Sequence, residues 1–76
     1  MADSEIADYK FIVKEGNPTY NGAPWLACEP GNHELSIVGD GSLGLRLREG
    51  TTLEQAQELA RLLQQRVAGL KYTPAG

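Results

Sequence analysis

The pattern of hydrophobic and polar positions is most regular between residues 34 and 48. Leucine and isoleucine alternate with polar residues on both sides of Gly39-Asp40-Gly41. This alternation is typical of two half-buried strands joined by a hairpin, so we expect strands over 34–38 and 42–48. Gly41 supplies the left-handed conformation at the end of a three-residue loop. The register that keeps the leucines on one face pairs Ile37 with Leu43, Leu35 with Leu45 and Glu34 with Arg46.

Two further strands are expected nearer the N-terminus. Tyr9–Lys14 is rich in β-branched and aromatic residues, and its alternation places Phe11 and Lys10 on opposite faces. The Gly, Asn and Pro residues of 15–24 predict a long loop. Trp25–Cys28 follows as a short strand that ends at a Pro-Gly turn. Counting back through that turn from the hairpin pairs Leu26 with Leu35 and Cys28 with His33.

The periodicity changes from two to 3.6 residues after Gly50, which predicts an amphipathic helix. Thr51 and Glu54 have the spacing of a capping box, and Gly69 is a suitable C-terminal stop. Leu62 lies beyond the edge of the apolar stripe, so the core does not require it. The stripe itself consists of Leu53, Ala56, Leu59, Ala60, Leu63, Val67 and Leu70.

These elements predict an α+β fold. We expect a single layer of four-stranded antiparallel sheet in the order β-β-β-β-α, with one C-terminal helix packed on one face. A chain of 76 residues suits one domain. We expect residues 1–7 to be a disordered lead-in, 8–72 to be the domain and 73–76 to be a frayed tail.

Composition and charge narrow the classes of function. The net charge of −3 disfavours binding to nucleic acid or to an anionic membrane surface. No run approaches the ~20 apolar residues that a membrane-spanning helix needs, and the acidic N-terminus does not resemble a signal peptide. We therefore expect a soluble cytoplasmic protein. Cys28 is the only cysteine, which excludes an intramolecular disulfide scaffold.

Candidate chemistry is sparse. Gly39, Gly41 and Gly44 have the spacing of a dinucleotide fingerprint, but a strand and not a helix is expected directly after them. Cys28 and His33 are neighbours in the predicted register, so a thiolate nucleophile or half of a metal site is one hypothesis. The alternative is a packed cysteine beside a histidine at a hairpin end, since no third group is evident. We favour this alternative and expect no enzyme, no catalytic residue, no metal ligand and no cofactor.

The leading functional hypothesis is protein contact. Trp25 is expected on the sheet face away from the helix, with Arg46 near it, and aromatic and arginine side chains are favoured anchors at interfaces. Leu62 is a further candidate on the helix. The expected partner is another protein or a second copy of the chain. An aromatic side chain among basic side chains on an open sheet also suits the binding of a single-stranded nucleic acid, which stays an alternative.

Three pieces of the sequence carry a resemblance. They are Trp-x-x-x-Glu-Pro from Trp25, Leu-Ser-Ile-x-Gly-Asp-Gly from Leu35, and Gly-Thr-Thr-x-Glu-x-Ala from Gly50. With them the chain resembles small uncharacterised bacterial proteins over about two-thirds of its length. The resemblance concerns turns, caps and core positions, and it implies no activity and no site residues.

Overall fold

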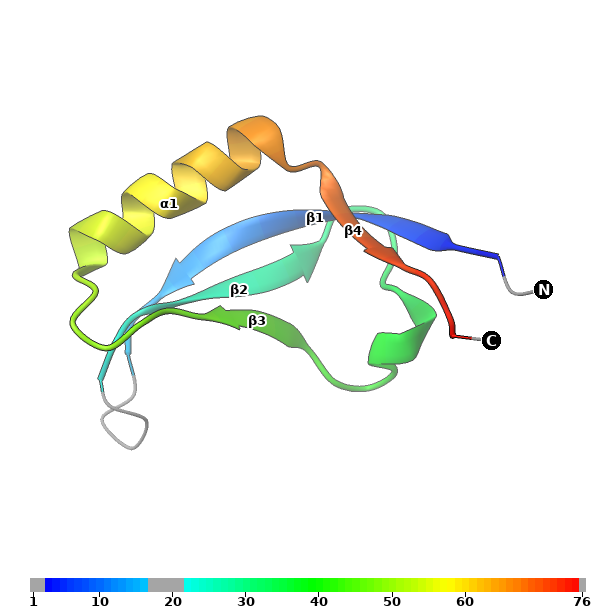
Figure 1. The fold of residues 1–76 in the computed structure, drawn as a ribbon, viewed down its shortest axis with the longest axis horizontal. Coiled ribbons are helices and arrows are strands. Elements are labelled where there is room, and N and C mark those ends of the chain that lie inside the picture. The colour runs from blue at the N-terminus through cyan, green and yellow to red at the C-terminus, as the bar shows by residue number, and fades with distance from the viewer. Residues whose placement is uncertain (1–2, 17–21, 76) are drawn as a thin grey trace.

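A four-stranded antiparallel sheet with one α-helix packed on it forms the fold (Figure 1). The computed structural model describes residues 3–16 and 22–75, so the centre of the expected 15–24 loop lies outside the described residues. The strand order in the sheet is β3-β2-β1-β4. The α+β prediction is confirmed. The described elements are β1 (Glu5–Lys14), β2 (Trp25–Pro30), the 3-10 helix η2 (Ser36–Val38), β3 (Leu43–Arg46), α1 (Leu53–Arg66) and β4 (Gly69–Tyr72).

Strand β1 is one of the two inner strands of the sheet, and it begins at Glu5 rather than at Tyr9 as expected. Its C-terminal part pairs with β2 and its N-terminal part pairs with β4. Ala7, Tyr9 and Phe11 alternate with exposed neighbours and are buried. This alternation gives the sheet one apolar face, as a half-covered antiparallel sheet requires.

The expected strand over 34–38 is wrong, and with it the Gly39–Gly41 hairpin register. This segment is a loop that contains η2, and β3 pairs with β2 instead. Two distant side chains hold the loop. The Tyr9 hydroxyl accepts the Leu35 N–H at 3.1 Å, and Glu5 Oε1 accepts the Ser36 N–H at 2.9 Å. These amides therefore cannot join a strand ladder.

The turn glycine was also misplaced. The residue with a positive φ in this turn is Gly39, at φ +60° and ψ −126°, and not Gly41. The three cross-strand pairs expected across the hairpin therefore do not form. In the observed register, Arg46 lies opposite Trp25 and Leu45 lies opposite Leu26.

The fourth strand follows the helix, so the connectivity is β-β-β-α-β and not β-β-β-β-α. Gly69 does not stop the helix but begins β4, where a Cβ would collide with the Ala7 carbonyl. Leu70 belongs to β4 and pairs with Ala7, so it is not part of the helical stripe. The free edge of β1 at Glu5–Asp8 gains its ladder partner in this way.

Helix α1 begins one residue later than expected. The Thr51 hydroxyl donates to the Arg48 carbonyl at 2.7 Å, so Thr51 belongs to the turn that precedes the helix. Thr52 is the N-cap, and its capping-box partner is Gln55 rather than Glu54. Val67 caps the C-terminus two residues before β4 begins.

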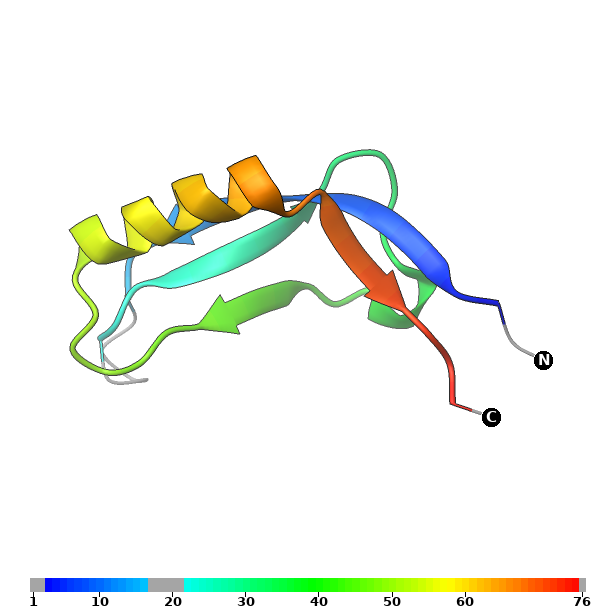
Figure 2. The same ribbon diagram turned by 45° about the horizontal axis from the view of Figure 1, so that its top comes forward.

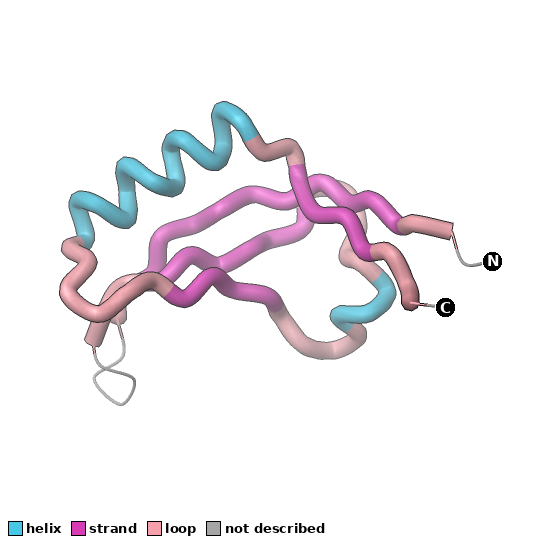
Figure 3. The backbone as a smooth tube through the Cα atoms, viewed as in Figure 1, coloured by secondary structure: helices cyan, strands magenta, loops and turns pink. Residues whose placement is uncertain are grey.

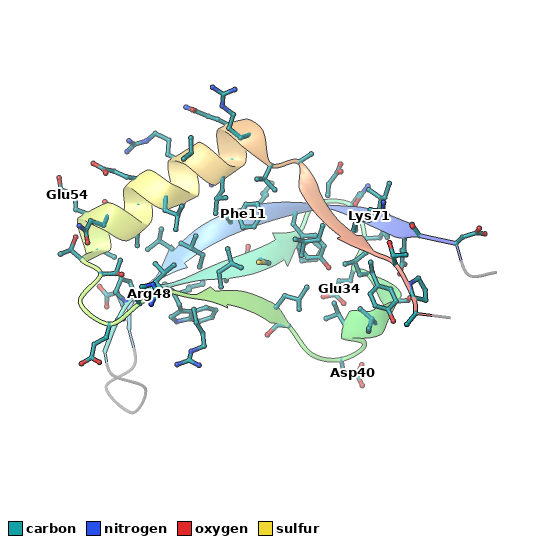
Figure 4. All side chains as sticks on the ribbon, viewed as in Figure 1. Phe11, Glu34, Asp40, Arg48, Glu54 and Lys71 are labelled. Carbon is teal, nitrogen blue, oxygen red and sulfur yellow. The ribbon has the colours of Figure 1, made fainter. Side chains whose placement is uncertain are left out.

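The apolar side of the sheet, which we call the helix face, is covered in two parts. Helix α1 contacts β1 and β2 (Figures 1 and 2), and Leu63 and Val67 pack on a core that includes Phe11 (Figure 4). The loop with η2, the short helix in Figure 3, places Leu35 and Val38 in the same core. One face of the sheet therefore contains the core, and no described helix covers the other face.

Candidate interaction surface

The uncovered side of the sheet, which we call the open face, carries the strand residues that point away from α1. Residues directly opposite each other in an antiparallel ladder point to the same face, so the register defines this surface. Its members are Ile6, Asp8, Lys10, Ile12 and Lys14 of β1, Trp25, Ala27 and Glu29 of β2, Gly44 and Arg46 of β3, and Gly69 and Lys71 of β4.

Trp25 and Arg46 are direct cross-strand neighbours on the open face, and Lys14 extends the same row on β1. The Trp25 side chain is 37% exposed and is not part of the core cluster around Phe11. Its ring lies over Gly44, where a Cβ would be 2.9 Å from two ring carbons. Gly44 therefore gives the indole room to lie against the sheet.

The open face is basic although the chain is acidic. Four of the seven Lys and Arg residues point to it, against two of the ten Asp and Glu residues. The bases are Lys10, Lys14, Arg46 and Lys71. Sequence alternation already separated Lys10 and Lys14 from Phe11, whereas Lys71 was missed because β4 is too short to show a period. Figure 4 shows Lys71 on β4.

Leu62 does not belong to this surface. It is 53% exposed on α1, which packs on the helix face, so the sheet separates it from Trp25. Glu34 is not opposite Arg46 either, because it lies in the loop between β2 and η2. The three predicted interaction residues thus divide into one adjacent pair and one separate leucine.

Cys28 and His33 are not cross-strand neighbours, which corrects the predicted pairing. Cys28 points to the helix face between Phe11 and Leu43, and it is 6% exposed. Burial raises the pKa of its thiol, which disfavours the thiolate that a nucleophile or metal ligand needs. His33 is exposed in the loop after β2. The described residues contain no group of three or more His, Cys, Asp or Glu side chains that could hold a metal ion.

Hollows beside the sheet are lined by residues of the described ranges. One, of about 260 Å³, lies where β3 begins and reaches Trp25, Cys28 and Glu29. Another, of about 450 Å³, lies between α1 and the edge of β1 beside Phe11. At that edge, Gln64 Nε2 donates to the Phe11 carbonyl at 2.9 Å, replacing the ladder bond that β4 is too short to supply.

Comparison with known proteins adds no relative. No family model, no curated protein and no solved structure matches the chain. None of the described helices has the length and apolar character needed to cross a membrane. The resemblance to small bacterial proteins therefore stays a prediction.

Proposed function

We propose that this chain is a non-enzymatic protein-contact domain whose open face binds an acidic segment of a partner protein. The observation that supports this proposal most directly is the row of Lys14, Trp25 and Arg46 on the face that α1 leaves uncovered. An aromatic anchor with bases on both sides combines apolar contact with charge complementarity. Lys10 and Lys71 extend the positive charge across the same face.

A titration with a synthetic peptide of alternating Glu and Leu, followed by NMR, tests the proposal. We expect the largest shifts at the Trp25 indole and at the amides of β1 and β2, and weaker binding as salt increases. Lys14→Glu should reduce binding more than Arg66→Glu, an equal change of charge on α1. Equal loss in both variants would mean that only net charge matters and would refute the assignment to the open face.

Trp25→Ala separates contact from folding. Because Trp25 is partly exposed and outside the core cluster, we expect the free energy of unfolding to change by only about 1 kcal/mol. Peptide binding should weaken by about tenfold, as loss of an aromatic anchor often does. A loss of about 3–5 kcal/mol of stability would instead identify a core tryptophan. Tryptophan emission close to that of the free amino acid in water would agree with an exposed anchor.

The same surface suggests a second candidate partner. The nucleobases of a single-stranded nucleic acid stack on aromatic side chains, and its phosphates contact Lys and Arg side chains. Trp25 and its basic neighbours offer both kinds of contact. Titration with oligo(dT) in parallel distinguishes the two candidates. Tighter binding of oligo(dT) than of the acidic peptide would replace protein contact with nucleic-acid binding.

A further inference from the structure

Strand β3 is an edge of the sheet whose outer backbone groups have no partner among the described residues. The Gly31 N–H donates to the Asp8 carbonyl, so the even-numbered residues of β1 point to β2. Because residues alternate along each strand, Leu43 and Leu45 of β3 point their backbone groups to β2. The N–H and C=O groups of Gly44 and Arg46 therefore point outward, where another strand can pair with them.

We propose that two copies of this chain pair through β3, antiparallel, about a two-fold axis at Leu45. In this register the outward N–H and C=O groups of Gly44 lie opposite those of Arg46 from the second copy. By symmetry, those of Arg46 lie opposite Gly44 of the second copy. Four hydrogen bonds close between the copies. Leu45 then lies opposite its own copy as a non-hydrogen-bonded pair, and Leu43 lies opposite Leu47 of the second copy. The pairing makes an eight-stranded sheet.

The side chains on the helix face are self-complementary in this register. Leu45 is 37% exposed in one copy, although Leu26 opposite it is fully buried. Pairing extends this apolar row across the axis, because every leucine of 43–47 meets a leucine of the second copy. Burial of apolar surface at the axis favours the dimer.

On the open face, contact between Arg46 and Trp25 favours a second copy over a foreign strand. Arg46 of the second copy lies opposite Gly44, which has no side chain to exclude it. The Trp25 ring already lies over Gly44, so the incoming guanidinium comes beside the indole, a favourable neighbour for a cation. The chain thus provides both halves of the contact.

This inference does not rest on the proposed function, because the oligomeric state is measured without any peptide. Sedimentation of the wild-type protein from about 1 μM to 1 mM should show a reversible monomer–dimer equilibrium. A monomer over the whole range would overturn the proposal. Arg66→Glu, an equal change of charge on α1, should leave the equilibrium unchanged.

A matched pair of variants at Arg46 tests the backbone pairing. Arg46→Ala removes only the side chain, whereas Arg46→Pro also removes an outward N–H that β2 does not use. We expect Arg46→Pro to weaken the dimer by about tenfold or more beyond Arg46→Ala, because two inter-copy hydrogen bonds are lost. Equal dissociation constants would overturn pairing through β3.

Cross-linking fixes the register and decides the question if Arg46→Pro does not fold. In a Cys28→Ala background, Leu45→Cys places two thiols across the axis at a spacing that suits a disulfide. Ser42→Cys is the control, since residue 42 lies far from its own copy in this register. If the disulfide between copies forms rapidly in Leu45→Cys but not in Ser42→Cys, the dimer is supported. If it forms in Leu45→Cys no faster than in Ser42→Cys, the proposal is overturned.

Discussion

The hydrogen bond from the Leu35 N–H to the Tyr9 hydroxyl carries a sharp prediction. Tyr9 is 5% exposed and Leu35 is 3% exposed, so the bond lies in the core. Tyr9→Phe keeps the ring and its packing and removes only the acceptor. The Leu35 N–H is then buried with no partner, which is costlier than the loss of an exposed hydrogen bond.

The expected cost follows from that burial. An unsatisfied buried polar group costs about 1–3 kcal/mol. A domain of this length has a total stability of about 4–11 kcal/mol, so the loss is a large share. Each kcal/mol lowers the melting temperature of a small domain by about 4–8 °C.

Urea unfolding measures this cost against a matched control. Tyr72→Phe removes a hydroxyl from a half-buried tyrosine whose side chain makes no hydrogen bond within the described residues, and it should change stability little. Hydrogen exchange at Leu35 and Ser36 should accelerate in Tyr9→Phe only. If the two variants unfold at the same urea concentration, the Tyr9 hydroxyl does not hold the loop.

Three further predictions concern the loop and the core. Gly39→Ala should lower the free energy of unfolding by about 1–2 kcal/mol, because a side chain is strained at the φ of +60° that Gly39 adopts. Calorimetry should find a smaller effect for Gly41→Ala. Equal melting temperatures of the two variants would show that the positive-φ residue of this turn is not Gly39. Cys28 should resist iodoacetamide until the protein unfolds, since the thiol is buried and its pKa is raised, and rapid alkylation of the native protein would contradict that burial. The Ser36 hydroxyl and N–H lower the pKa of Glu5, so their contribution to stability is present above the ordinary value of 4.5 and is lost as the pH falls through the lowered value. The urea midpoint of the wild type should fall with pH more steeply than that of Glu5→Gln. If the two midpoints depend on pH in the same way, the Glu5–Ser36 contact does not contribute to stability.

The sequence by itself determined the elements whose signals are local. Period-two alternation predicted β1, β2 and β3, and the 3.6-residue stripe predicted α1 to within a few residues at its ends. The same alternation predicted that Trp25 and Arg46 share the open face, since strand parity places side chains without knowledge of the partner strand. Leu26, Cys28, Leu43 and Leu45 were likewise correctly placed together on the other face.

Only the tertiary structure decided which segments joined the sheet. Residues 34–38 have a strand-like pattern, but Tyr9 and Glu5, 26 and 31 residues away, bind the amides of Leu35 and Ser36. Gly69–Tyr72 has no strong pattern, yet it forms β4 because α1 returns the chain to the unpaired edge of β1. Local sequence encodes a preference for extended or helical backbone, whereas the partner of each backbone hydrogen bond depends on where distant segments pack.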